Sequence, residues 1–355
     1  MQHRYFAAAN SSEGFKSYFG EIFGDCEELY IIKGGPGTGK SSFMKKVALG
    51  AERRGNFVEY YLCSSDPDSI DGVLISDKGR RVGIVDGTSP HIFEPTYPAA
   101  KDEILNFGEF WDSRLIRSQK NEIFSLTNKK SAAYKRAYSY LRSCGNLMAV
   151  TDSLIRYATD FSKLQAVAER TVAMLELERG ELISRPAILS GVTMVGERRL
   201  TSFETNAERL WKVGDYYGVG KWFLDILLGI LKSRDAKARV SCDPISVNKT
   251  DGIFIEGINA AFVLSDNADN ADDAHGEEGS HFINPKRFVR TEKLREVRAE
   301  LRYAARLYRD CLDGALHSLA EARVYHFLLE DIYKNAMDFK ALNSFTSEFT
   351  EKLFD

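Results

Sequence analysis

The segment that most constrains the fold of this chain lies at 30–42 and reads YIIKGGPGTGKSS. It fits the pattern G-x-x-x-x-G-K-[ST] of phosphate-binding loops, or P-loops. A short apolar run at 29–32 precedes it, and an amphipathic helical pattern at 41–54 follows it. Because a chance match would seldom have both a strand before it and a helix after it, we expect an α/β unit whose loop binds a nucleoside triphosphate.

The residue types in this loop suit a polyphosphate. Glycines let the backbone curl so that successive N–H groups face the ligand, and the helix N-terminus adds partial positive charge. Lys40 is expected to neutralise the β- and γ-phosphates, and the Ser41 hydroxyl to bind Mg²⁺. We expect ATP as the nucleotide. The expected binding residues for ATP and Mg²⁺ are Gly34, Gly35, Pro36, Gly37, Thr38, Gly39, Lys40, Ser41 and Ser42.

Composition narrows the class of protein. With 355 residues the chain exceeds the size at which one hydrophobic core usually suffices, so we expect two domains. Its 48 basic and 51 acidic residues leave a net charge of −3, which indicates neither nucleic acid nor an anionic membrane as a partner. Five scattered cysteines without a C-x-x-C pair indicate reduced thiols, and we find no signal-peptide pattern or membrane-spanning run. These features predict a cytoplasmic protein.

A second, weaker copy of the same plan follows the first. Four landmarks recur with offsets between 177 and 181 residues, and a long helical region follows each copy. Four concordant offsets are hard to produce by chance, so we expect a tandem duplication. The matched landmarks are Lys40 with Lys221, Asp66 with Asp243, Asp71 with Asp251, and Asp86 with Asp266.

The predicted fold class is therefore α/β, with two tandem P-loop NTPase units, each a mainly parallel sheet flanked by helices and followed by a helical hairpin. Residues 11–23 also predict a helix, with Asn10 as its N-cap. A break near 143–146 divides the first helical region into an antiparallel pair, because Gly145 and Asn146 suit a helix end. The predicted boundaries are 1–98 for the first unit, 99–182 for its hairpin, 183–283 for the degenerate second unit, and 284–355 for the last helical region.

The second copy has lost most of the residues that bind phosphate and Mg²⁺. Asp215 stands in place of Gly34 and would repel phosphate, and Trp222 in place of Ser41 removes the hydroxyl. We expect a structural pseudo-domain, with a weak or regulatory nucleotide site as the alternative. Features kept in both copies then indicate scaffold more than chemistry. The pairs assigned to turns on this ground are Asp66-Pro67 and Asp71-Gly72.

Asp86 ends an apolar strand pattern, as the acid of a Mg²⁺ site does, and we expect it to bind or orient the metal. In the proline-rich loop at 87–98, His91 is a candidate for sensing the γ-phosphate or orienting a water, with a hydrogen bond inside its own loop as the alternative. Glu94 is the nearest candidate base. Since Gly87 and not a glutamate follows Asp86, we expect slow hydrolysis or a different base. The candidate catalytic residues are Lys40, Asp86, His91 and Glu94.

The motifs GGPGTGKSS, CSSDPDSIDG, VGIVDGTSPH and EPTYPAAKDEI resemble those of a poorly characterised family of bacterial P-loop ATPases, found largely in spore-forming and anaerobic Gram-positive lineages. The resemblance covers nearly the whole chain and implies two tandem P-loop units, nucleotide binding and ATP hydrolysis. Family members commonly keep an intact second loop of the GKPGTGKS kind, whereas this chain reads GDYYGVGKW there. The chain thus departs from the two-site mechanism that the resemblance implies.

Three hypotheses for function follow. The leading one is a slow Mg-dependent ATPase whose helical segments move with nucleotide state. The second is a small-molecule or nucleotide kinase with Asp66 or Asp68 as base, although the recurrence of Asp66-Pro67 in the second copy weighs against it. The third is a non-enzymatic, nucleotide-gated interaction module. The expected partners are a nucleoside triphosphate and, for the third hypothesis, an unidentified protein or a second copy of the chain.

Overall fold

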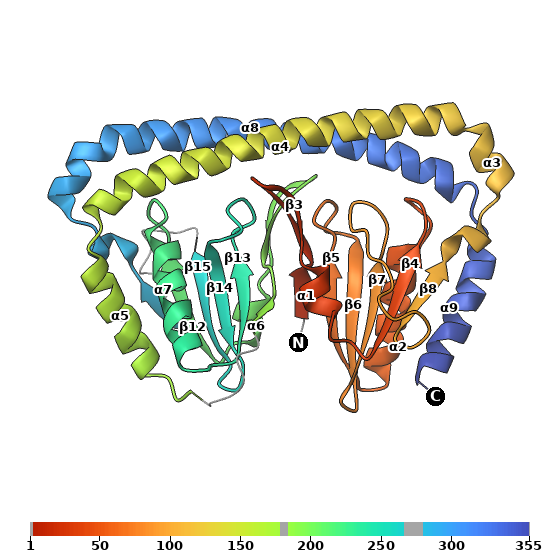
Figure 1. Ribbon diagram of the computed structural model, residues 1–355, viewed down its shortest axis with the longest axis horizontal. Helices are drawn as coiled ribbons and strands as arrows, with labels where there is room; N and C mark the ends of the chain where they lie inside the picture. Colours follow the sequence, from red (N-terminus) through yellow and green to blue (C-terminus); the bar gives the residue numbers. More distant parts are fainter. Residues whose placement is uncertain (1–2, 178–183, 266–279, 355) are drawn as a thin grey trace.

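The computed structural model of the chain describes residues 3–177, 184–265 and 280–354. Two α/β bodies stand side by side beneath a pair of long helices (Figure 1). The first repeat comprises β1 (His3–Phe6), β2 (Ala8–Ser11), β3 (Gly14–Ser17), α1 (Phe19–Phe23), β4 (Glu28–Lys33), α2 (Lys40–Arg53), β5 (Phe57–Leu62), β6 (Ile70–Asp77), β7 (Arg80–Asp86), β8 (Asp102–Asn106), the 3-10 helix η1 (Phe107–Phe110), α3 (Ser113–Ser118), α4 (Lys120–Ala158) and α5 (Phe161–Ala173). The second comprises β9 (Ser184–Pro186), β10 (Ser190–Thr193), β11 (Gly196–Arg199), α6 (Ser202–Asn206), β12 (Arg209–Gly214), α7 (Val219–Ser233), β13 (Ala238–Cys242), β14 (Thr250–Ile255), β15 (Ala260–Ser265), β16 (Ser280–Ile283), η3 (Pro285–Phe288), α8 (Thr291–Lys334) and α9 (Phe339–Phe354).

Each body is built on a six-stranded mixed sheet, which confirms the predicted α/β class. The strand order is β1-β5-β6-β7-β4-β8 in the first sheet and β16-β12-β15-β14-β13-β9 in the second. Strand β4 is parallel to both neighbours, β7 and β8, whereas β6 runs antiparallel to β5 and β7. In the second sheet, β12 is likewise parallel to both neighbours, β15 and β16, and β14 runs antiparallel to β13 and β15. The helices α2 and α7 each bury their apolar face against the sheet, where the two main hydrophobic cores lie.

The two bodies pack about an approximate two-fold axis. Ser12 N donates to Ile245 O at 3.0 Å, and Met194 N donates to Ser65 O at 2.9 Å. Met194 is the counterpart of Ser12 and Ile245 is the counterpart of Ser65, so each body makes the same hydrogen bond to the other. On the axis itself, the guanidinium of Arg239 pairs with the carboxylate of Glu59, and these residues lie 180 positions apart. Contacts between counterparts are the property of a two-fold interface. The two repeats therefore pack as the subunits of a symmetric dimer do, within one chain.

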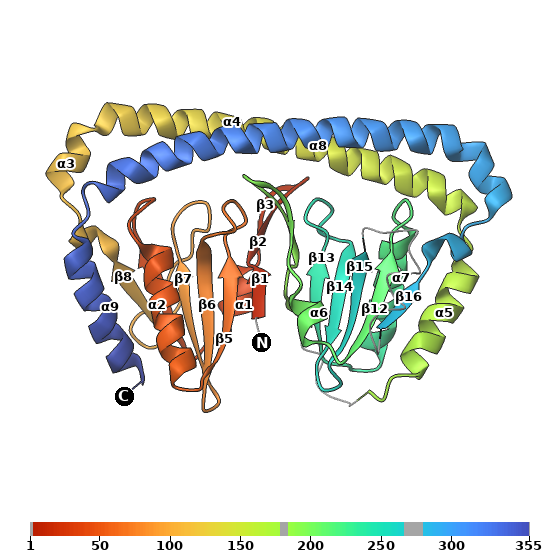
Figure 2. The same cartoon turned by 180° about the vertical axis from the view of Figure 1, so that it is seen from behind.

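The long helices α4 and α8 pair with each other along their length and bridge both bodies (Figure 2). As a result, the shorter helices are exchanged: α5 packs on α7 of the second body, and α9 packs on α2 of the first. The predicted hairpin within 99–182 is therefore wrong, because the partner of α4 comes from the other repeat. The predicted break at 143–146 is also wrong, since α4 is continuous there. Gly145 serves a close contact, because a Cβ on it would lie 2.5 Å from the Ser12 Cβ.

Two further expectations fail for local reasons. Residues 11–23 form the β2–β3 hairpin and the short α1, because Gly14 adopts φ +99° and Ser11 Oγ donates to Gly14 O at 2.7 Å, which closes a turn. The intended cap, Asn10, instead donates to Ser64 O and Val192 O. The predicted end of the first unit at residue 98 is also wrong, because residues 102–106 form the edge strand β8 of its sheet and not the start of a helical hairpin. Within the described residues, no helix is long and apolar enough to cross a membrane.

Candidate functional site at the glycine-rich loop

The loop between β4 and α2 has the predicted surroundings. β4 ends at Lys33 and α2 begins at Lys40, so the strand and the helix are confirmed. Gly37 and Gly39 have φ values of +70° and +88°, a region that favours glycine, and Gly39 caps the helix. Thr38 Oγ1 donates to Gly35 O at 2.8 Å and braces the loop from within. The loop lies at the carboxyl end of a parallel strand, where α/β sheets bind their ligands.

Lys40 and Asp86 form the charged centre of this site. Lys40 is 9% exposed, and its Nζ donates to Gly35 O at 2.6 Å and lies 3.5 Å from Asp86 Oδ2. The other carboxylate oxygen, Oδ1, accepts hydrogen bonds from Thr88 N at 2.9 Å and Thr88 Oγ1 at 2.6 Å. Burial raises the pKa of the Asp86 carboxyl, against the pull of Lys40. The acid that ends β7 therefore faces the lysine that opens α2.

The donor set fits Mg²⁺ and a polyphosphate. Ser41 follows Lys40 in the first turn of α2, and its Oγ accepts the N–H of Ile70 at 3.1 Å, which leaves the hydroxyl one lone pair and its proton. A hydroxyl and a carboxylate are the hard oxygen ligands that Mg²⁺ takes. Pro36 lies in the loop, and Ser42 is exposed on α2.

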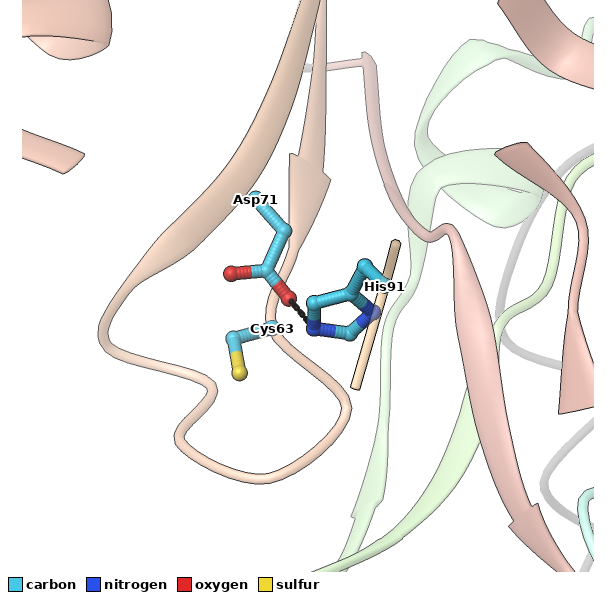
Figure 3. Close-up of side chains that lie close together, drawn as sticks. All are labelled: Cys63, Asp71 and His91. Atoms are coloured by element: carbon cyan, nitrogen blue, oxygen red, sulfur yellow. Dashed lines mark ion pairs between the residues drawn. The ribbon is translucent and has the colours of Figure 1, made fainter. Parts of the chain in front are cut away.

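His91 and Glu94 do not contact the loop directly. His91 is 7% exposed; its Nε2 lies 2.8 Å from Asp71 Oδ2, and its ring packs on Phe15 (Figure 3). Burial alone would lower the pKa of His91, but the Asp71 carboxylate raises it. Glu94 is exposed and pairs with Lys33 at 2.6 Å. The structure therefore favours a structural partner for His91 over a water in the site.

The assignment of Asp71-Gly72 to a turn is wrong. Asp71 lies inside strand β6 and is 6% exposed. Burial raises the pKa of its carboxyl, but His91, together with Cys63 and Lys40, lowers this pKa overall. An acid within the apolar stretch IDGVLI was a signal for this, since a buried carboxylate needs a partner. That partner lies about twenty residues later in the chain, where local patterns give no hint of it.

Sheet register corrects how the two repeats match. Leu62 pairs with Ile70 in the first sheet and Cys242 with Thr250 in the second, and the loops between them have equal length. Asp243 therefore corresponds to Cys63, and the predicted match of Asp66 with Asp243 is wrong by three residues. Asp66 corresponds to Ser246, and both turns are closed by the same bond, Ser69 N to Asp66 O and Lys249 N to Ser246 O.

The acid at the end of β7 is not repeated. Val213 pairs with Leu264 as Ile32 pairs with Asp86, so Leu264 occupies the register position of Asp86. The expected counterpart, Asp266, lies outside the described residues. Features present in both repeats were taken to indicate a structural role. Because Asp86 is present only in the first repeat, this criterion favours a functional role for it.

The second loop is occupied by its own acids. Helix α7 begins at Val219, two residues before Lys221, so the loop is shorter than the first. The carboxylate of Asp215 accepts the N–H of Gly220 at 3.0 Å, and Lys221 Nζ lies 2.6 Å from Asp243 Oδ2. Donors that would face a phosphate are thus satisfied within the protein, which supports the predicted loss of nucleotide chemistry.

Two helices from the second repeat pack on the first loop, a feature that the sequence did not reveal. A Cβ on Gly35 would lie 2.6 Å from the Tyr333 ring, and one on Gly37 would lie 2.6 Å from Glu330 O, both in α8. A Cβ on Gly39 would lie 2.8 Å from Leu342 of α9. The glycines therefore allow close packing by α8 and α9 as well as the curl of the loop.

No known protein-family model, curated protein or solved structure matches this chain.

Proposed function

We propose that the chain binds Mg·ATP at the loop between β4 and α2 and hydrolyses it slowly. The observation that carries this proposal is the buried contact between Lys40 and Asp86, at 3.5 Å, at the N-terminus of α2. A lysine, a helix N-terminus and an acid at the end of the neighbouring parallel strand are the parts that phosphate and its metal require.

Each residue has a distinct part in this proposal. The loop N–H groups and Lys40 bind the phosphates, while Ser41 and Asp86 hold the metal. Thr88 fixes one oxygen of Asp86 through two hydrogen bonds and leaves the other facing Lys40. Because Glu94 is paired with Lys33, it is not free to act as the base, which supports slow turnover.

Hydrolysis would be coupled to the helices through α8 and α9. Tyr333 and Leu342 pack where the loop glycines have no side chains. A change in the loop between nucleotide states would therefore be transmitted to α8, and through α8 to α4.

The test measures ATP affinity and phosphate release by the full chain, with Lys40→Ala as the variant and Lys221→Ala as its matched control. We expect Lys40→Ala to abolish both. Lys221→Ala should leave ATP affinity unchanged, because Lys221 is paired with Asp243. Unchanged ATP affinity in Lys40→Ala would refute the proposal, and so would loss of affinity in a well-folded Lys221→Ala.

A second candidate, phosphotransfer to a small acceptor, gains support from the corrected register. Asp66 has no acidic counterpart in the second repeat, so the argument that it is scaffold no longer holds. Burial raises the pKa of Asp66, as suits a base. The test is a screen for an acceptor that accelerates ADP release in the wild type and not in Asp66→Asn. No acceleration by nucleosides or sugars would count against it.

A further inference from the structure

Three metal-ligating side chains meet beside the loop, outside the site described so far. Cys63 follows β5, Asp71 lies in β6, and His91 lies in the loop after β7 (Figure 3). Their ligand atoms lie within 4.8 Å of one another. Asp71 and His91 are 6% and 7% exposed, while Cys63 is partly exposed.

We propose that Cys63, Asp71 and His91 bind one transition-metal ion, Zn²⁺ or an ion of similar softness. Thiolate, carboxylate and imidazole are the ligands that zinc takes, and three of them leave one position of the tetrahedron open. Ca²⁺ and Mg²⁺ are disfavoured because they prefer oxygen ligands alone.

The geometry needs only side-chain adjustment. Zinc bonds of roughly 2.0–2.3 Å place tetrahedral ligand atoms about 3.3–3.7 Å apart. His91 Nε2 and Asp71 Oδ2, at 2.8 Å, would move slightly apart, and the pairs separated by up to 4.8 Å would close by about an ångström. The three ligands come from neighbouring strand ends, so the backbone already holds them together.

Burial and the Asp71 carboxylate raise the pKa of the Cys63 thiol well above its ordinary value, so a thiolate here needs the charge of a bound metal ion. The backbone N–H groups of Ser65 and Asp66 donate to Cys63 Sγ at 3.4 and 3.5 Å. Such donors stabilise negative charge on sulfur, as outer partners of metal ligands do.

The second repeat provides an internal comparison. Asp251 holds the position of Asp71, but its cationic neighbour is Arg199, at 3.9 Å. Asp243 holds the position of Cys63 and pairs with Lys221. The fold of a repeat therefore requires only a cationic group next to the buried aspartate. At these positions the thiol and the imidazole, the two ligands that favour zinc, occur only in the first repeat.

The experiment titrates the full-length, metal-free chain with Co²⁺, followed by competition with Zn²⁺. We expect one ion per chain, a dissociation constant for Zn²⁺ below roughly 1 μM, the intense visible absorption of tetrahedral cobalt, and a sulfur-to-cobalt band. Cys63→Ser should remove the sulfur band and weaken binding at least about 100-fold. The matched control is Cys242→Ser, whose thiol contacts the Tyr18 hydroxyl at 2.9 Å and should not matter to the metal.

A second measurement does not depend on the folding of a variant. In the wild type, Zn²⁺ should slow alkylation of Cys63 without changing that of Cys311, read out by mass spectrometry. Absence of saturable binding to the wild type would overturn the proposal. So would a sulfur band that survives in Cys63→Ser, or equal protection of both cysteines. Loss of the zinc site would leave the ATP proposal standing, because Lys40 is not among the three ligands.

Discussion

The ion pair on the two-fold axis makes a quantitative prediction about what holds the bodies together. Glu59 is 4% exposed and pairs with Arg239 of the other repeat. Arg239 has a second partner, Glu256, at 2.7 Å, and it lies 5.7 Å from the centre of the Tyr5 ring. Glu59, by contrast, depends on Arg239 to neutralise it. The two ends of the pair should therefore tolerate mutation very differently.

Arg239→Met retains much of the side-chain volume but leaves the Glu59 carboxylate buried without a cation. Removing one partner of a buried pair costs about 3–5 kcal/mol of the free energy of unfolding. Glu59→Gln leaves Arg239 paired with Glu256, so we expect a cost of about 1–2 kcal/mol, that of a weakened charged hydrogen bond. In the double variant neither the Glu59 carboxylate nor the guanidinium remains, so most of the cost of Arg239→Met should be recovered.

Urea denaturation of the full chain, followed by circular dichroism, measures these differences in the first unfolding transition. Arg239→Met should shift that transition far more than Glu59→Gln. Equal costs for the two single variants would refute the reasoning, because they would mean that Glu256 does not share the arginine. A double variant no better than Arg239→Met would show that the loss comes from packing and not from the buried charge.

Two further predictions concern the helices. Gly145→Ala in α4 should lower the free energy of unfolding by about 1–3 kcal/mol, because the new methyl group would clash with the β2–β3 hairpin. Gly229→Ala in α7, where nothing lies within 4 Å of the new methyl group, should raise the free energy of unfolding by up to about 1 kcal/mol. Equal effects of the two substitutions in thermal melts would contradict this prediction. For Glu330, burial is outweighed by hydrogen bonds with His326 and Lys334, which lower its pKa to about 2, below the unfolded value of roughly 4.3. Its stabilising contribution is present above pH 4.3 and lost as the pH falls towards 2, so the melting temperature of Glu330→Gln should fall less over that range than that of the wild type.

Local features of the fold could be predicted from the sequence. The strand, loop and helix around Lys40 follow from hydrophobic periodicity and glycine spacing, which act over a few residues. The position of Asp86 at the end of a strand was predicted from the apolar pattern before it, and Asp86 does end β7. These predictions needed no knowledge of distant partners.

The errors arose where a distant contact decides. Gly145 resembles a helix end, yet it lies inside a helix, where it allows close contact with a hairpin more than a hundred residues away in the sequence, so no local pattern distinguishes the two cases. The match of Asp66 with Asp243 was wrong by three residues. Both loops contain an Asp-Pro pair, and aligning these pairs gives an offset that the strand register does not support. The grouping of Cys63 with Asp71 and His91, and the packing of α8 and α9 on the loop, likewise depend on contacts between residues far apart in the sequence.

The exchange of helices explains why a degenerate second body remains useful. Helix α8 has 44 residues and is about 66 Å long at 1.5 Å per residue, so it extends from the second body to the loop of the first. Its end supplies Tyr333 over Gly35, and the following α9 covers α2. If the second body were lost, the first would lose the helices that cover its own loop. The second body therefore holds the start of α8 in place, and this structural role depends on its fold and not on the residues of its own loop.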